Sequence, residues 1–331
     1  MAAPLRPSGT LRVFAYEDSF PDAYIGPFLK RYPELRFEHI SYDTDGEAME
    51  RLEGGVEAEV LAACVEETLA WLVARRHLQP LDTARLACWD RLAPAFRGLP
   101  GITVEGQTWM APVDSAPTGL MFDTTNPRHP RSFSDLLTAD LGGAVALDAK
   151  PVIALHIAAL AIGIADPPGM NRADLDRVAA FLLDLKARSR FPILWRTGDD
   201  LLRLFGSHSI VASSGFPGDT RDLQRRGLPV AFAVAEESPV LFACGFGLAA
   251  SCANFEGAYA FLNFVLEADS QAEMARSMDF MVSNIDAASS VALNPDNPIG
   301  GLPRLLEAGP PPRPPERPEA WAEIWARVLQ A

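Results

Sequence analysis

The order of apolar segments along the chain is the feature that most restricts how it can fold. Short strand-like runs of apolar residues alternate with longer segments whose apolar side chains recur at helical spacing. In the first part of the chain, the predicted elements are a strand at 11–15, a helix at 20–32, a strand at 36–41, a helix at 47–52, a strand at 59–63 and a helix at 68–75. Alternating strands and helices predict a parallel sheet with helices on its faces, which is an α/β fold.

The alternation stops and then resumes, which predicts two α/β halves. Segments 110–123 and 240–250 are expected to be extended, and a second alternation lies between them. Its predicted elements are a strand at 144–147, helices at 152–162 and 172–188, and strands at 209–212 and 230–234. A further helix at 255–267 is predicted after the second extended segment. A chain of 331 residues is long enough for two domains, so we expect it to cross between the halves more than once.

The C-terminal segment departs from this pattern. Residues 309–318 are rich in proline, which can neither continue a helix nor donate to a sheet. We interpret the segment as a stiff connector to an amphipathic helix at 319–329, where Trp321 and Trp325 share one face. The alternative interpretation is a ligand for an SH3-type domain.

Charge and composition exclude several classes of function. The formal net charge is −14 and no block of Lys or Arg offsets it, so nucleic-acid binding is not expected. No run of 18 apolar residues is present, so no membrane-spanning helix is predicted. The first ten residues lack the apolar core of a secretory signal, which leaves a cytosolic protein or an exported protein whose signal has been removed.

The sequence carries no recognisable catalytic motif. It has no nucleophile elbow, phosphate-binding loop, zinc-protease motif or dinucleotide fingerprint, so we expect neither an enzyme nor a cofactor. The four cysteines, Cys64, Cys88, Cys244 and Cys252, lack metal-ligand spacing, so no metal site is expected, whereas a disulfide is allowed. His156 lies in an apolar predicted helix and is interpreted as a core or cleft residue.

Two pairs of adjacent acids stand at predicted helix starts. Asp199 and Asp200 stand at a predicted helix start, where carboxylates cap backbone amides. Glu66 and Glu67 follow a predicted strand, so they either cap the next helix or contact a ligand at the carboxyl end of the sheet. An enzyme that uses one of these glutamates with His156 is the alternative from a different functional class.

Several short motifs occur in an order that is found in a known family. They are Leu11–Tyr16 followed by Phe28, Ser41–Asp45 followed by Leu52, Gln79–Asp82, Ala111–Val113, Thr118–Asp123, Ser132–Leu136, Asn254–Ala258, Phe261–Phe264 and Val282–Ala287. Through them, nearly the whole chain resembles the spermidine/putrescine-binding proteins of bacterial ABC importers. The resemblance implies a two-lobed, periplasmic-binding-protein-like α/β fold, in which each lobe is a mixed sheet flanked by helices and a hinged cleft separates the lobes. It implies that lobe 1 comprises residues 10–116 and 246–285, and lobe 2 residues 117–245 and 286–331.

The resemblance also implies which residues contact the ligand. They are Tyr16, Glu17, Ser19, Asp43, Cys64, Glu66, Glu67 and Ser115 from the first part of the chain, and Lys150, Ile153, Ser213, Phe216, Phe242, Cys244 and Phe246 from the second lobe and the second crossing. Lys150 and Ile153 stand where the family has two acids, and Phe242–Cys244 replaces its Trp-x-Asp motif. An unpaired ammonium in a closed cleft costs several kcal/mol, so a polyamine is not expected here.

The sequence therefore predicts a substrate-binding protein of a transport system that closes on a small organic ligand. We expect that ligand to be neutral or largely apolar, amphipathic or lipid-like; the alternatives are a polyamine, or an anion held by Lys150 and helix N-termini. The expected partners are the small-molecule ligand and a membrane permease, and the chain is expected to be a periplasmic monomer whose signal peptide was removed. We expect Cys244 to line the pocket as a free thiol.

Overall fold

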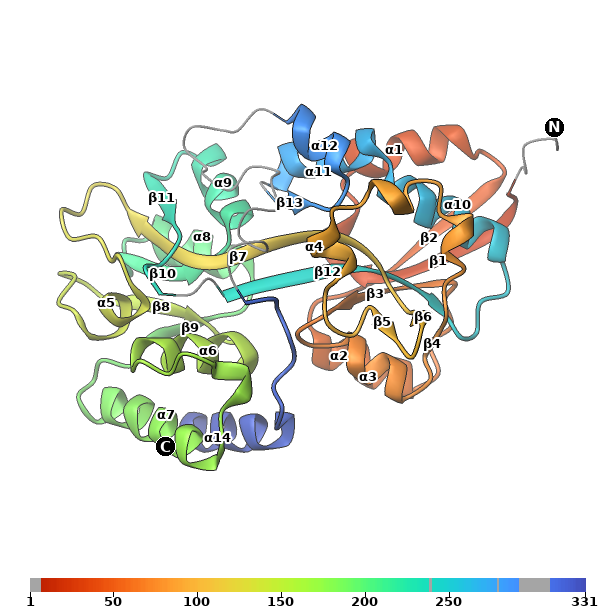
Figure 1. Cartoon of the computed structure of the whole chain (residues 1–331). Helices are drawn as coiled ribbons and strands as arrows, with labels where there is room; N and C mark the ends of the chain where they lie inside the picture. Colours follow the sequence, from red (N-terminus) through yellow and green to blue (C-terminus); the bar gives the residue numbers. More distant parts are fainter. Residues whose placement is uncertain (1–6, 238–239, 279, 292–309) are drawn as a thin grey trace. The chain divides into compact units, whose positions relative to one another are not determined.

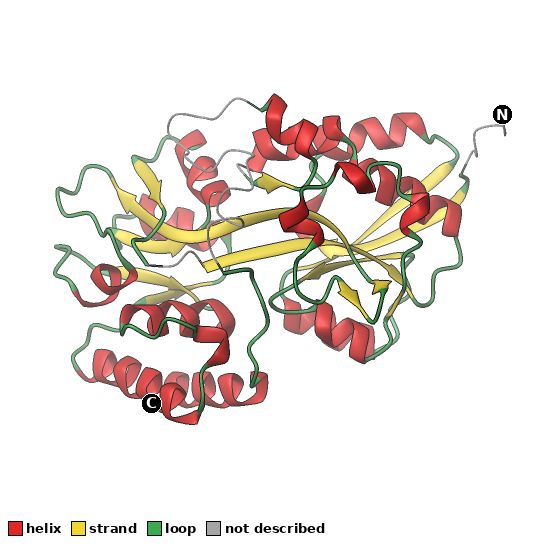
Figure 2. Cartoon of the chain, in the orientation of Figure 1, coloured by secondary structure: helices red, strands yellow, loops and turns green. Residues whose placement is uncertain are grey.

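The structure is a computed structural model that describes residues 7–237, 240–278, 280–291 and 310–331 (Figure 1). It divides into two compact units. Unit 1 contains the described residues up to Ser115 and those from Phe242 to 291, and unit 2 contains Ala116–Leu241 and residues 310–331. In each unit the strands have helices on both sides (Figure 2). Among the described residues, no helix is both long and apolar enough to cross a membrane.

Unit 1 is built on a mixed sheet. Its main elements are β1 (Gly9–Tyr16), α1 (Asp22–Arg31), β2 (Leu35–Tyr42), α2 (Asp45–Glu53), β3 (Val60–Cys64), α3 (Leu69–Ala74), β4 (Leu78–Gln79), α4 (Pro94–Arg97), β5 (Thr103–Val104), β6 (Gln107–Thr108), α10 (Phe255–Leu266), α11 (Ala268–Met278), β13 (Met281–Val282) and α12 (Ile285–Ser290), together with parts of β7 (Ala111–Asp123) and β12 (Val240–Ala249). The strand order is β2-β1-β3-β12-β7. β1 is parallel to β2 and β3, whereas β12 is antiparallel to β3.

The core of unit 1 lies where α1 and α10 cover one face of this sheet. Leu11 and Val13 of β1 point into the core at alternate positions, as the period of a strand requires. Phe28 of α1 meets Phe261 of α10 edge to face, with ring centroids 5.7 Å apart. Phe14 on the opposite face of β1 is buried as well, which accounts for the nearly continuous apolar sequence of this strand.

Unit 2 is a second mixed sheet with helices. Its elements are α5 (Phe133–Thr138), β8 (Val145–Asp148), α6 (Pro151–Ala161), α7 (Arg172–Ala187), β9 (Ile193–Trp195), α8 (Gly198–Gly206), β10 (Ala212–Gly215), α9 (Pro217–Arg225), β11 (Val230–Ala233) and α14 (Pro318–Gln330). β10, β8 and β9 are mutually parallel, and β7 pairs antiparallel with both β10 and β11. The predicted strand at 209–212 was thus placed too early, because the small residues Ser213–Gly215 lack the apolar pattern that marks a strand.

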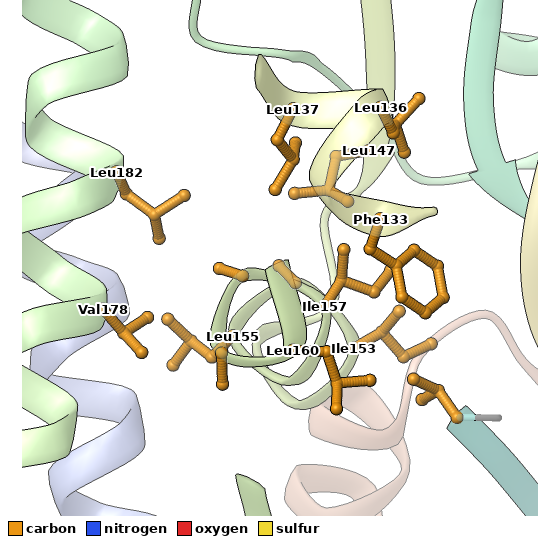
Figure 3. Close-up of a cluster of buried hydrophobic side chains, with 14 of the residues drawn as sticks. Phe133, Leu136, Leu137, Leu147, Ile153, Leu155, Ile157, Leu160, Val178 and Leu182 are labelled. Atoms are coloured by element: carbon orange, nitrogen blue, oxygen red, sulfur yellow. The ribbon is translucent and has the colours of Figure 1, made fainter. Parts of the chain in front are cut away.

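The main core of unit 2 surrounds α6. Ile153, Leu155 and Ile157 are buried on several sides of this helix, and Val178 and Leu182 of α7 face it (Figure 3). A helix that is apolar all round must be covered all round, and α14 completes the cover by packing against α6 and α7.

The C-terminal helix is held by both apolar and ionic contacts. Trp321 and Trp325 are buried, as their shared face predicts. Arg172 donates to both carboxylate oxygens of Glu323 at 2.9 and 3.0 Å. In the connector, Arg313 forms an ion pair with Asp166. The described part of this proline-rich segment therefore delivers the terminal helix to unit 2.

The chain passes from unit 1 to unit 2 inside β7 and back to unit 1 inside β12; the described residues up to 291 then belong to unit 1 and those from 310 onward to unit 2. The residues from Phe242 to Gly245 and those of α12 belong to unit 1, whereas the family resemblance assigns residues 242–245 and 286–290 to lobe 2.

Candidate ligand-binding site

The carboxyl ends of three parallel strands form one edge of the unit 1 sheet. In the register of β1 and β2, Tyr16 lies opposite Tyr42, and their rings are 4.7 Å apart. The Tyr16 hydroxyl donates a hydrogen bond to Asp45 at the start of α2. This helix begins here because Thr44 accepts the backbone N–H of Glu47 at 3.2 Å. Two aromatic rings and a carboxylate are therefore fixed at the edge where ligands of α/β sheets bind.

This edge is strongly acidic. Glu17 and Asp43 are exposed, and Glu66 and Glu67 are half-buried. Burial raises the pKa of Tyr16 well above its ordinary value, and the negative charges of Asp45 and Glu67 raise it further. The Tyr16 hydroxyl therefore stays neutral and remains a donor at physiological pH. The surrounding carboxylates favour a cationic group at this edge.

Glu66 has a structural role at this edge as well as a charge. Its Oε2 accepts the backbone N–H of Ala243 at 3.1 Å, at the point where β3 ends beside β12. The backbone N–H of Cys64, at the end of β3, donates to the Thr68 hydroxyl. The Glu66 carboxylate thus joins the end of β3 to the neighbouring strand.

Cys244 is not a free thiol. It forms a disulfide with Cys64, whose Cα lies 4.1 Å away in the antiparallel pair of β3 and β12. The expectation of a pocket-lining thiol is thus wrong. The physical reason is the strand register, which places the two residues directly opposite each other although 180 positions separate them in the sequence.

Two predicted ligand contacts are buried in the hydrophobic cores. Phe246 is buried in the core of unit 1, where its ring lies edge to face with Phe261 at 5.2 Å. Ile153 is buried in the core of unit 2 (Figure 3). Their apolar character is required by packing and carries no information about a ligand. Phe242, by contrast, is half-buried and its ring meets Phe280 edge to face.

Unit 2 presents a cation at the carboxyl end of its sheet. Lys150 follows β8 and directly precedes α6, and it is half-buried. Its backbone N–H donates to Asp148 Oδ1 at 2.8 Å, and the N–H of Asp148 donates to Ser214 Oγ at 2.9 Å. Pro151 in the first turn fits a helix start because its missing N–H would be unpaired there. The Lys150 ammonium and the positive end of α6 both favour an anionic group.

The remaining predicted site residues are Ser19, Ser115, Ser213 and Phe216. Ser115 is buried and donates to the Phe242 carbonyl oxygen, and Ser213 is buried and donates to the carbonyl oxygen of Ser214. Ser19 is half-buried in a 3-10 turn after β1. Phe216 is half-buried at the start of α9. The hydroxyl protons of Ser115 and Ser213 are therefore both donated to backbone carbonyl oxygens.

Asp200 and His156 lie where the sequence interpretation places them. Asp200 accepts the N–H of Thr197 and forms a capping box at the start of α8, which confirms the capping interpretation. Burial lowers the pKa of His156 to about 4. The half-buried imidazole is thus neutral at pH 7, as expected for a core or cleft histidine.

Sequence reasoning missed two residues of the unit 1 edge as site residues, Tyr42 and Asp45. Tyr42 is brought there by the register of β1 with β2, in which the last residues of the two strands are neighbours, and Asp45 by its hydrogen bond from Tyr16. The motif at 41–45 was recognised, but only Asp43 was selected from it. The missing signal was the strand register, which a single sequence does not give.

Comparison with known proteins identifies what the chain resembles. A family model described as bacterial extracellular solute-binding protein matches residues 23–298. The spermidine/putrescine-binding periplasmic protein 1 of Haemophilus influenzae is 24% identical over 218 residues. That match covers 65% of this chain and spans 58% of the length of the relative.

Solved structures show the same fold. The spermidine/putrescine ABC transporter substrate-binding protein PotD of Streptococcus pneumoniae superimposes with a TM-score of 0.80 and 14% identity, over 98% of both chains. The periplasmic binding protein MotA of A. tumefaciens B6, solved in complex with glucopine, has a TM-score of 0.75 and 16% identity, over 97% of this chain and 99% of that one. These comparisons confirm the predicted two-lobed α/β fold and the predicted resemblance. The matched family consists of solute-binding proteins, in agreement with the prediction that the chain is not an enzyme.

Proposed function

Because the chain belongs to the bacterial extracellular solute-binding protein family, we propose that it captures a small organic solute and delivers it to the membrane permease of an ABC importer. The observation that carries this proposal is the strand-end edge of unit 1, where Tyr16, Tyr42 and several carboxylates are fixed by backbone and side-chain contacts. We place the protein in the periplasm, as a monomer.

Capture by closure of the two units is part of the proposal. Two of the passages between the units lie inside β7 and β12, where the division falls next to Ser115 and Phe242. Few covalent links of this kind permit a hinge. Ser115 donates to the Phe242 carbonyl oxygen, so the two strands are joined at the unit 1 side of the hinge.

The ligand we propose is net neutral but polar: a zwitterion with an ammonium and an acidic group. The carboxylates near Tyr16 favour the ammonium, and Lys150 with the N-terminus of α6 favours the anion. The apolar or lipid-like ligand expected from the sequence loses its support, because Phe246 and Ile153 are core residues and Cys244 is bonded to Cys64. The expectation of a neutral ligand is retained.

A polyamine is the second candidate. It is favoured by the acids of the unit 1 edge, among them Glu17, Asp43, Glu66 and Glu67, and by the name of the Haemophilus influenzae relative. It is disfavoured by Lys150, which would place a like charge near the second ammonium of such a ligand.

Native mass spectrometry tests the capture of a solute. The chain is incubated with the small-molecule fraction of a bacterial extract, separated from free solute and sprayed without denaturant. We expect a one-to-one complex whose small molecule is recovered unchanged after denaturation. A chain that retains no solute, or one that converts its ligand on prolonged incubation, would contradict the proposal.

A further inference from the structure

The disulfide of unit 1 joins two neighbouring strands beside a carboxylate. Cys64 is the last residue of β3, and Cys244 is its partner in the register of β12. Cys64 is buried, whereas Cys244 is partly exposed. Both sulfur atoms and a carboxylate oxygen of Glu66 lie within 4.8 Å of one another. Three potential metal ligands are thus gathered at one place on the sheet.

The backbone holds these three residues in position. The N–H of Val65 donates to the Ala243 carbonyl oxygen at 2.9 Å, and the N–H of Ala243 donates to Glu66 Oε2 at 3.1 Å. The two hydrogen bonds fix the end of β3 against β12 independently of the sulfur–sulfur bond. A carboxylate has about four lone-pair sites, so it can bind a cation while it also accepts hydrogen bonds.

We propose that the reduced form of this disulfide is a binding site for one thiophilic divalent cation of the Zn²⁺ or Cd²⁺ type. The ligands are Sγ of Cys64, Sγ of Cys244 and a carboxylate oxygen of Glu66, and solvent takes the fourth position. Three protein ligands with mixed sulfur and oxygen donors suit a tetrahedral ion of this class.

The distances support this assignment. With metal–sulfur bonds near 2.3 Å, two sulfurs on one tetrahedral ion are about 3.8 Å apart, and a sulfur and an oxygen are slightly closer. The three donor atoms already lie within 4.8 Å of one another. Once the sulfur–sulfur bond is broken, the two cysteine side chains are free to rotate about χ1 toward the required spacing.

The redox step balances with a dithiol as reductant. The dithiol supplies two electrons and two protons, the bond between Cys64 and Cys244 breaks to give two thiols, and the reductant becomes a cyclic disulfide. Because Cys244 is the more exposed partner, we expect the attacking thiolate to form the mixed disulfide with it and to release Cys64. Binding of the cation then displaces the two thiol protons. The oxidised form has no thiolate and is not a site.

The test is a Cd²⁺ titration of the full chain carrying Cys88→Ser and Cys252→Ala, so that Cys64 and Cys244 are the only thiols. The protein is reduced with dithiothreitol, which is then removed under nitrogen, and ultraviolet absorption reports thiolate-to-Cd²⁺ charge transfer. We expect one equivalent of Cd²⁺ to bind to the reduced protein and no charge-transfer band in the oxidised protein. Cation binding should also raise the thermal midpoint of the reduced protein.

Glu66→Gln and the neighbouring Glu67→Gln form a matched pair, because each removes one negative charge. We expect Glu66→Gln to weaken Cd²⁺ binding by at least the ~10-fold that the loss of even an outer-shell partner costs, and Glu67→Gln to have a smaller effect. If the two variants weaken Cd²⁺ binding equally, Glu66 is not a ligand of the cation and the proposed site is wrong. Absence of the band in the reduced protein, or unfolding of unit 1 on reduction as seen by circular dichroism, would overturn the proposal.

Discussion

Removing the Cys64–Cys244 disulfide should destabilise unit 1 much more than unit 2. The bridge closes a loop across 180 positions that includes unit 2 apart from its C-terminal segment with α14. The chain-entropy relation gives about 5 kcal/mol for a loop of this length. When unit 2 stays folded while unit 1 unfolds, only about 50 residues of the loop gain freedom, and the expected loss is about 4 kcal/mol.

Amide hydrogen exchange measures this loss separately for each unit. The variant Cys64→Ala with Cys244→Ala is compared with the oxidised chain, and Cys88→Ser with Cys252→Ala is the control for the unpaired cysteines. We expect the free energy of exchange to fall by about 4 kcal/mol for the slowest amides of β1 and β3, with little change in β8 and β10. A loss below about 1 kcal/mol in unit 1, or an equal loss in both units, would refute the reasoning.

Three further predictions concern packing, titration and closure. Gly245→Ala should lower the stability of unit 1 by about 1–3 kcal/mol or more in urea unfolding, because the new Cβ would lie 2.1 Å from the Ala111 carbonyl oxygen, whereas Gly26→Ala, with open space around its Cβ, should not destabilise. The pKa of His156 is lowered to about 4 in the folded state, so the unfolded state binds its proton first and stability should fall between pH 6.5 and 4 by up to about 3 kcal/mol; His156→Leu should abolish that part of the pH dependence, and an unchanged dependence would contradict it. In small-angle scattering, a saturating ligand should reduce the radius of gyration, and an unchanged radius would count against closure.

Much of the fold could be predicted from local patterns. The helix of α7 and the strands of β1 and β2 lie within a few residues of their predicted positions, because apolar periodicity reports burial directly. β10 was misplaced because its sequence, Ala-Ser-Ser-Gly, is made of small residues with no such pattern. Its strand character comes from pairing with β7 and β8, which are distant in sequence.

The site was less predictable than the fold. Glu66 and Glu67 could be proposed from the end of a strand, since that position follows from the α/β topology, whereas Lys150 was implied by the family resemblance. The disulfide could not, because it depends on the register between β3 and β12. Phe246 and Ile153 illustrate a second reason. The sequence does not distinguish an apolar residue that lines a ligand pocket from one that packs in the core.

The central claim is the ligand class, and a matched pair of ligands tests it most directly. Putrescine and 4-aminobutyrate have the same backbone length and differ in one end group, an ammonium in the first and a carboxylate in the second. They are titrated calorimetrically, with spermidine and amino acids of graded length, into the wild-type chain and into Lys150→Glu. We predict heat from at least one zwitterion and none from the polyamines at near-millimolar concentration, and we expect Lys150→Glu to lose the zwitterion and to gain affinity for diamines. Micromolar binding of spermidine or putrescine to the wild-type chain would contradict the account.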